Sequence, residues 1–236
     1  MIRALDHVVL AAADLERAAR TYETLLGRPP VWSGEGSPRR ARFGLANMAL
    51  VLSAADGGEA GFVGLGFGSA DPAETLRMLE RRGLGPGGGD GVAITVTPIA
   101  DPEPEAVRDD LVEALDHVVI LSPNPDRAVA LYGARLGLDF RLDRANPQWG
   151  TRLMFFRCGG AVLEVSADLK APVSDGPDRI TGLAWRVRNP RAAQRRLAAA
   201  GLDVSQVRPG RKPGTAVFTL RSGLEGAPAL LIGPAG

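Results

Sequence analysis

The sequence predicts an α+β fold made of four related repeats, each with the order strand, helix, strand, strand, strand (βαβββ). Three observations support this prediction. Stretches of sequence recur at fixed offsets, each recurrence opens with a strand pattern and a helix start signal, and each helix pattern ends at a glycine. Because such repeats determine the architecture of a chain, the 236 residues are expected to form a tandem duplication with two repeats in each half.

The repetition is clearest in the stretches Leu5–Leu10 and Leu115–Ile120, which read LDHVVL and LDHVVI and lie 110 residues apart. After a three-residue insertion the alignment of the first and third repeats continues at an offset of 113. The second and fourth repeats align at an offset of 118, which pairs Gly83 with Gly201. Matches at constant offsets over this length indicate common ancestry of the two halves rather than chance.

Each repeat opens with the same local signals. In the first, residues 4–11 alternate as a strand, Asp14 is a helix N-cap, and an apolar stripe of period 3.6 leads to Gly27. The other repeats start their helices with a cap residue followed by proline, at Asn124-Pro125, Asp71-Pro72 and Asn189-Pro190. Four helices are therefore expected, one in each repeat.

The remaining strands follow the helices. They are expected at about 139–143, 151–158 and 161–167 in the third repeat, and at about 203–208, 215–221 and 228–233 in the fourth. The second repeat has only GLGPGGGDG between its helix and the run VAITV at 92–96, so at least one strand is expected to be missing. No strand leads into these glycines and no P-loop lysine follows, which favours a shortened turn over a phosphate-binding loop.

The domain organisation follows from the repeats and one proline-rich segment. Residues 98–113 hold three prolines with acidic residues between them and are expected to be a linker. The N-terminal half then covers residues 1–97, with its second repeat incomplete, and the C-terminal half covers residues 114–236.

Composition limits the function classes. Lys and Arg number 28 against 27 Asp and Glu, so the net charge of +1 gives no support for nucleic-acid or membrane binding. The single cysteine, Cys158, excludes an internal disulfide framework, and no signal peptide or stretch of 18 apolar residues occurs. A cytoplasmic protein is expected, as a monomer or homodimer that binds a small molecule.

The stretches LDHVVLAAADLERAARTYETLLG and LDHVVILSPNPDRAVALYGARLG resemble the opening strand and helix of the vicinal oxygen chelate superfamily. That superfamily includes glyoxalase I, extradiol ring-cleaving dioxygenases, fosfomycin-resistance enzymes and bleomycin-resistance proteins. The resemblance covers nearly all of residues 4–233. It implies two curved mixed sheets, each made by two repeats, with helices on the convex faces and a ligand-binding cup on the concave side.

The resemblance also implies positions for metal ligands, which come from the first and last strands of paired repeats. Carried onto this sequence, these positions are His7, Gly64, His117 and Gly182 in first strands, and Val51, Glu164 and Leu230 or Leu231 in last strands. The implied cofactor is a divalent metal (Fe, Mn, Ni or Zn) held by His117 and Glu164, or no metal at all.

Strand parity tests Glu164 independently of the family. Along 161–166, Leu163 and Val165 point to one face and Glu164 to the other, so Glu164 projects into the cup if its apolar neighbours pack on a helix. A carboxylate in such an apolar strand must be solvated, paired or bound to a metal. The alternative to a metal ligand is a solvated Glu164 or one paired with Arg152 or Arg157.

The two histidines are weighed in the same way. A single histidine on an apolar strand is commonly a hydrogen-bonded core residue, and His7 has Val51 where His117 has Glu164. By parity, Asp6 is expected to point away from the face of His7. If the third and fourth repeats pair, only His117 and Glu164 remain. If the first and third pair, His7 joins them as a 2-His-1-carboxylate set suited to non-haem iron.

Further candidate substrate-binding residues are Trp149, Arg152, Trp185, Arg211 and Lys212. Arg211 and Lys212 lie in the predicted hairpin tip RPGRKPGT and are candidates to bind an anionic group, or are simply solvated. Trp149, Arg152 and Trp185 offer aromatic and cationic cup surface, and the aromatics fit a core equally well.

The leading interpretation is a metal-dependent enzyme, a lyase, isomerase or ring-cleaving dioxygenase acting on a small molecule with vicinal oxygens. In it Glu164 is the catalytic residue and the metal acts as a Lewis acid. The alternative is a metal-free protein of the bleomycin-resistance type, which binds or sequesters its ligand.

Overall fold

The computed structural model describes residues 1–34, 39–55, 57, 59–85, 87–100, 108–221, 224–225 and 227–235. The first sheet is formed by β1 (Ile2–Ala12), β2 (Val31–Ser33), β3 (Arg40–Gly44), β4 (Ala49–Ala54), β5 (Gly61–Ser69) and β6 (Ala93–Pro98). The second is formed by β7 (Val112–Leu121), β8 (Asp139–Asn146), β9 (Thr151–Cys158), β10 (Ala161–Asp168), β11 (Arg179–Val187), β12 (Arg208–Pro209), β13 (Thr215–Leu220) and β14 (Ala229–Pro234).

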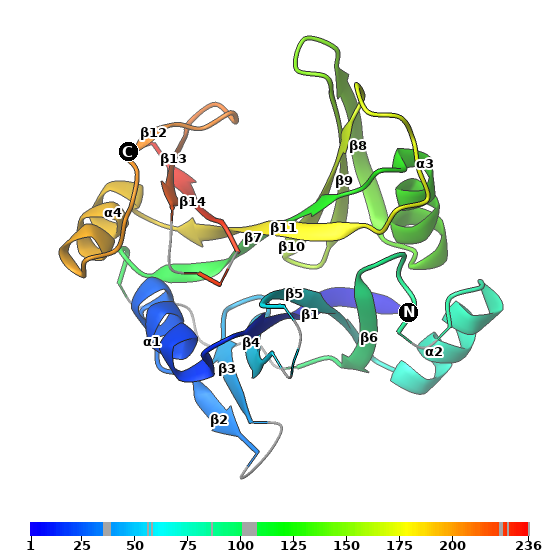
Figure 1. Cartoon of the computed structure of the whole chain (residues 1–236), viewed down its shortest axis with the longest axis horizontal. Coiled ribbons are helices and arrows are strands. Elements are labelled where there is room, and N and C mark those ends of the chain that lie inside the picture. Colours follow the sequence, from blue (N-terminus) through cyan, green and yellow to red (C-terminus); the bar gives the residue numbers. More distant parts are fainter. Residues whose placement is uncertain are drawn as a thin grey trace. The chain divides into compact units, whose positions relative to one another are not determined.

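The strand orders are β2-β3-β4-β1-β5-β6 and β12-β13-β14-β11-β7-β10-β9-β8, and both sheets mix parallel and antiparallel neighbours (Figure 1). The predicted α+β fold with two curved mixed sheets is therefore confirmed. In the second repeat, only β6 follows the helix among the described residues, which agrees with the expected loss of strand structure.

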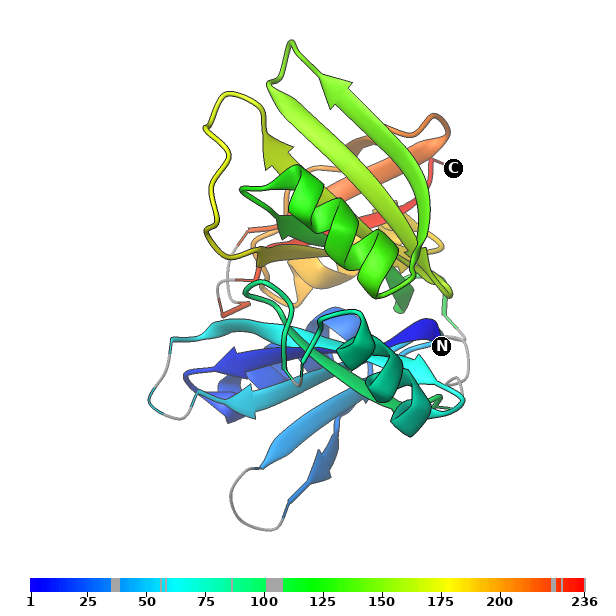
Figure 2. The ribbon, with the colours of Figure 1, turned by 90° about the vertical axis from the view of Figure 1, so that its right-hand side faces the viewer.

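The helices are α1 (Leu15–Leu26), α2 (Pro72–Arg81), α3 (Pro125–Ala128), which continues as the π-helical η1 (Val129–Arg135), and α4 (Pro190–Ala199). The four predicted caps are confirmed, because each cap side chain accepts a hydrogen bond from the amide three residues later: Asp14, Asp71, Asn124 and Asn189. The π-helical segment was not predicted. Figure 2 shows the third helix against its sheet, where α3 contacts β10 and η1 contacts β9.

The fourth repeat corrects one strand prediction. Residues 203–208 do not form a continuous strand, since only Arg208–Pro209 pairs with β13 and Val204 makes an isolated bridge to Leu220. Between them, the Ser205 hydroxyl oxygen accepts the amide hydrogen of Thr219 at 3.0 Å. The Ser205 side chain thus accepts from the Thr219 amide, which a backbone carbonyl would accept from in a continuous strand pair with β13, and the backbone pairing is interrupted there.

The chain forms two compact units that each combine segments from both halves. The first comprises Met1–Val8, Val63–Asp101 and His117–Thr181, and the second comprises Val9–Phe62, Pro102–Asp116 and Gly182–Gly236. Residues 101–107 of the predicted linker lie outside the described residues. The division into N-terminal and C-terminal domains stays a prediction. None of the described helices is long and apolar enough to span a membrane.

Candidate functional site

His117 and Glu164 lie side by side on neighbouring parallel strands of the first compact unit. The register pairs Val162 with His117 and Glu164 with Val119, and it brings Nε2 of His117 to 3.6 Å from Oε2 of Glu164. The two side chains are 16% and 19% exposed. Leu163 is fully buried, as parity requires if the apolar residues of β10 pack beneath the helix. Glu164 therefore points to the opposite face of the sheet, as predicted.

The strands beside this pair present apolar side chains and one arginine, Arg157 of β9, which lies opposite Val162. The register of β10 with β9 places Phe155 opposite Glu164 and Leu153 opposite Ser166, and Leu142 of β8 lies opposite Phe155. Paired residues of antiparallel strands share a face, so the carboxylate has hydrophobic side chains beside it and a cation at the next pair along the strand. An ionisable pair in such surroundings marks a candidate binding or reaction site.

A cavity of about 450 Å³ lies at the carboxyl ends of β7 and β10. Leu121 and Asp168 line it, each four residues beyond His117 or Glu164 on the same strand and therefore on the same face. At a rise of ~3.3 Å per residue this separation is about 13 Å. The segments that follow β7 and β10 and the first residue of β11 complete the lining with Ser122, Pro123, Ala171, Pro172, Ser174, Gly176, Pro177 and Arg179.

Sequence reasoning did not single out this cavity or Arg179. The signal available was the proline-rich segment 171–178 between two apolar strands, which is typical of a shaped loop. Which strand face the loop covers depends on long-range contacts, so the segment alone could not place the cavity.

A buried ionic network fixes the loop that lines the cavity. Asp178 is fully buried and accepts hydrogen bonds from Arg127 at 2.8 Å and from the Tyr132 hydroxyl at 3.3 Å. Arg127 also donates to the carbonyl oxygen of Gly176 at 2.6 Å. Burial, with the nearby carboxylate of Asp178, raises the pKa of Tyr132 well above its usual value. The third helix thereby anchors the cavity wall.

His7 has local partners in the first sheet. Its Nδ1 lies 2.7 Å from Oδ2 of Asp6, and a Cβ built on Gly66 would lie within 2.5 Å of the imidazole ring. The expectation that Asp6 points away is wrong. Leu5 and Val8 are both fully buried although they lie on opposite parities, so the simple alternation breaks at Asp6 and His7.

His7 does not complete a metal set with His117 and Glu164. All three belong to the first compact unit, yet no group of three or more His, Cys, Asp or Glu side chains is placed to hold a metal ion within the described residues. The described residues give the 2-His-1-carboxylate set no support, and it stays a prediction. The His7 ring packs against β5 in the first sheet, whereas His117 and Glu164 lie on strands of the second.

Comparison with known proteins gives the family. Residues 116–218 match the family model described as the Glyoxalase/Bleomycin resistance protein/Dioxygenase superfamily. The C-terminal half of the chain belongs to this superfamily. The resemblance to the vicinal oxygen chelate superfamily is thereby confirmed, and no curated protein matches the chain.

Solved structures extend the likeness to the whole chain. A triple mutant of 4-hydroxymandelate synthase from Streptomyces coelicolor has a TM-score of 0.76 and 15% identity, covering 100% of this chain and 94% of that one. The Mn(II)-bound glyoxalase from Novosphingobium aromaticivorans has a TM-score of 0.72 and 18% identity, covering 98% and 82%. Likeness at these identities shows a common fold, and function must be argued from this chain's own residues.

The other ligand positions expected for a vicinal oxygen chelate protein are occupied by residues without donor side chains. A Cβ on Gly64 would lie 2.9 Å from Cβ of Ala93 and closer still to its carbonyl oxygen, so the neighbouring strand fills that space. A Cβ on Gly182 would lie 3.1 Å from the carbonyl oxygen of Pro228. The register pairs Leu230 with Ala184 and so assigns the last-strand position of the fourth repeat to Leu230, not to the fully buried Leu231.

Two of the predicted substrate-binding residues lie elsewhere in this vicinal oxygen chelate fold. Arg152 is paired with Ala167 on the helix side of the sheet, and its guanidinium bonds Asp143 at 2.8 Å and Asp126 of α3 at 2.9 Å. It therefore pairs neither with Glu164 nor with a ligand beside it. Trp185 is fully buried, which makes it a core residue.

Three further candidates lie in turns. Trp149 is 58% exposed in the turn between β8 and β9. Arg211 and Lys212 are exposed in the turn that precedes β13. Their contribution to ligand binding stays a prediction.

Proposed function

We propose that this protein is a small-molecule enzyme in which Glu164 and His117 move a proton on an oxygen-containing substrate. The observation that carries the proposal is the 3.6 Å approach of the carboxylate and imidazole beside the apolar residues Phe155 and Leu153. Burying ionisable groups in such surroundings is costly, and active sites are where that cost is commonly found. The cavity of about 450 Å³ on the same face would accommodate the remainder of the substrate.

In this proposal Glu164 acts as the general base and removes a proton from the carbon next to a carbonyl group. The N–H of His117 at Nε2 donates a hydrogen bond to the carbonyl oxygen as negative charge develops on it. Return of the proton to the same or a neighbouring carbon gives an isomerase, and loss of a neighbouring leaving group gives a lyase. The apolar neighbours Phe155 and Leu153 would limit water around the carboxylate.

A resident metal ion fits the described residues poorly. His117 and Glu164 are close enough to share one ion, but structural and catalytic sites generally use at least three protein ligands. Gly182 and Leu230 supply no donor side chain at the other expected positions. The proposed proton transfer therefore uses no metal. Elemental analysis of untagged protein, before and after incubation with Fe, Mn, Ni and Zn, is expected to give well under one ion per chain.

The second candidate function is ligand binding without chemistry, as in bleomycin-resistance proteins. The loss of donor residues at Gly64, Gly182 and Leu230 favours it, because a sequestering protein needs no metal or base. In that case His117 and Glu164 would only bind the ligand.

Solvent-deuterium exchange separates the two candidates. The protein is incubated in D₂O with panels of 2-oxo acids, 2-hydroxy acids and acyl thioesters, and deuterium incorporation next to the carbonyl is followed by NMR. An enzyme of the proposed kind incorporates deuterium, and Glu164→Gln should slow incorporation by ~10²–10⁴ fold. The matched control is Glu113→Gln on β7, which changes a carboxylate of similar exposure that is paired with Arg188.

The control variant should keep its rate. A ligand that binds with no incorporation in the wild type would contradict the enzyme and support the binding protein. Equal rates in Glu164→Gln and the wild type would remove Glu164 from the catalytic role.

A further inference from the structure

The fourth repeat carries positive charge out of proportion to the rest of the chain. Residues 182–236 contain nine Lys and Arg but two Asp and Glu, although the whole chain has a net charge of +1. A charge excess confined to one repeat is a local feature that whole-chain composition conceals. It favours an anionic ligand for this part of the protein.

The helices of the second and fourth repeats show where this difference lies. In α2, Glu74 pairs with Arg77 at 2.9 Å and with Arg81 at 3.3 Å. At the offset of 118, α4 has Ala192 in place of Glu74 and Arg195 in place of Arg77. The helix of the fourth repeat has thus kept the arginine and lost its acidic partner.

The same helix has also gained a second cation. Arg191 stands where α2 has Ala73, four residues before Arg195, and like charges at this spacing destabilise a helix. In the described part of the chain neither arginine has an acidic partner. The third arginine, Arg196, is engaged elsewhere and donates to the carbonyl oxygens of Thr24 and Leu25 at 2.6 and 2.9 Å. An unfavourable pair of this kind is compensated when an anion binds between or beside the two charges.

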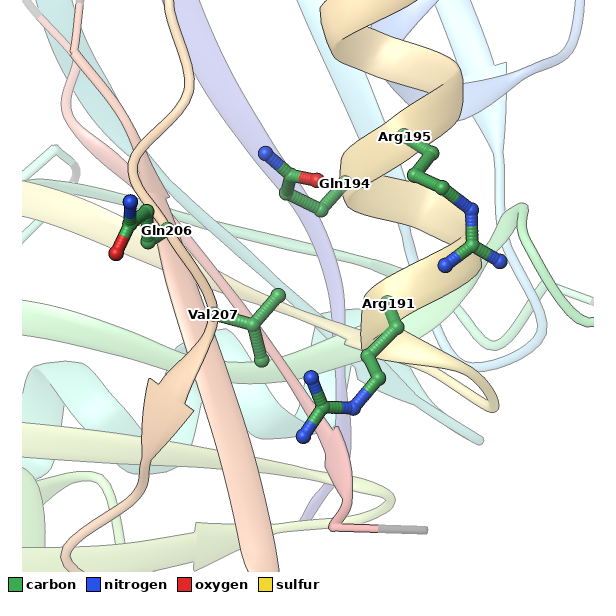
Figure 3. Close-up of a pocket in the computed structure, with 5 residues that line it drawn as sticks. All are labelled: Arg191, Gln194, Arg195, Gln206 and Val207. Carbon is green, nitrogen blue, oxygen red and sulfur yellow. The ribbon is translucent and has the colours of Figure 1, made fainter.

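A cavity of about 290 Å³ lies at these residues, within the second compact unit. It is lined by Arg191, Gln194 and Arg195 of α4 and by Gln206 and Val207 of the segment before β12. In Figure 3, Arg191 and Gln194 extend from the helix toward Gln206 and Val207, and the Arg195 side chain runs along the helix toward the turn of Arg191. The lining therefore offers two guanidinium groups and two carboxamides but no carboxylate.

We propose that this cavity binds the phosphate group of a small phosphorylated molecule. Two guanidinium groups balance a phosphate monoester, which carries about −1.5 to −2 charges at neutral pH, better than a single carboxylate. Arginine matches phosphate through paired N–H donors, and the amide groups of Gln194 and Gln206 can supply further donors. Val207 provides apolar contact for the organic part of the ligand.

The test is calorimetric titration of the full-length protein with inorganic phosphate and, separately, with glycerol 3-phosphate. Saturable binding of at least one is expected, and Arg191→Ala and Arg195→Ala should each weaken it by about tenfold, the equivalent of one charge-assisted hydrogen bond of ~1.4 kcal/mol. The matched control is Arg77→Ala, which removes the equivalent arginine of α2 and should leave affinity unchanged. Tighter binding of glycerol 3-phosphate assigns the site to an organic phosphate, and tighter binding of inorganic phosphate assigns it to the free ion.

Three results would overturn the proposal. The first is that neither compound binds saturably to the wild type at concentrations up to about 10 mM, which is near the weak limit of specific binding. The second is an equal loss in Arg77→Ala, which would indicate a general charge effect. The third is much tighter binding of a DNA oligonucleotide with steep salt dependence, which would indicate an extended surface for a polyanion. None of these readouts depends on the activity proposed for His117 and Glu164.

Discussion

Replacing Gly66 with alanine is expected to destabilise the protein because the new methyl group would occupy the place of the His7 ring. The built Cβ lies within 2.5 Å of the imidazole, so the ring must move. Moving it breaks the 2.7 Å contact with Asp6, worth ~1 kcal/mol if the ring is neutral and up to ~3 if it is charged. A strained rotamer adds ~0.5–1.5 kcal/mol.

Part of this cost is offset, because alanine lowers the entropy of the unfolded chain by ~0.4–1 kcal/mol. The net loss for Gly66→Ala is therefore about 1–3 kcal/mol. In a chain of this length that lowers Tm by roughly 2–4 °C per kcal/mol. Urea unfolding followed by circular dichroism measures the free energy directly.

A double-mutant cycle with His7→Ala isolates the contact. Once the ring is absent, the methyl group has space, and Gly66→Ala should be neutral or slightly stabilising in the His7→Ala background. An equal loss of stability in both backgrounds would refute the packing of His7 on Gly66. It would also reopen the question of what His7 does in the first sheet.

Three other perturbations test the remaining structure. Asp178→Asn should destabilise by ~1.5–3 kcal/mol in urea unfolding, because it removes the charge of the fully buried hydrogen-bond partner of Arg127 and leaves only Asp90, 3.7 Å from the guanidinium. A loss under about 1 kcal/mol would show that the network does not anchor the loop. Burial raises the pKa of Cys158 to about 12, so the native thiol should resist a disulfide reagent at pH 8 and react fully in urea. Its contribution to the free energy of unfolding should be present below about pH 8.5 and disappear as pH rises toward 12. Rapid labelling of the native protein would contradict the burial of the thiol. Gly64→Ala should lower the Tm more than Gly182→Ala, because the new Cβ at residue 64 would lie closer to the backbone of Ala93 than the new Cβ at residue 182 would lie to that of Pro228. The reverse order would contradict the described strand pairing.

The sequence by itself determined the features that depend on near neighbours in the chain. Asp14 and the other caps could be assigned because a cap side chain bonds an amide three residues away. The orientation of Glu164 relative to Leu163 followed from the two-residue period of a strand. The duplication could be read directly, because homologous repeats keep their offsets when intervening segments change.

Local rules failed where a side chain's surroundings came from distant parts of the chain. Parity placed Asp6 away from His7, but the strand departs from simple alternation at that point and the two side chains meet. The strand expected at 203–208 was lost because Ser205 bonds Thr219, fourteen residues away. No sequence pattern at Ser205 reveals which backbone group will lie within reach of its hydroxyl.

Only the tertiary structure decided which candidate residues share a site. Arg152 and Glu164 lie on neighbouring strands, but the antiparallel register puts Arg152 opposite Ala167 and turns it toward Asp126 on the helix side. His7 and His117 occupy equivalent positions in two repeats, yet they lie in different sheets. Equivalence in sequence fixes the position of a residue within its own repeat, whereas proximity depends on which strands pair and in what register, and those are set by contacts between segments far apart in the chain.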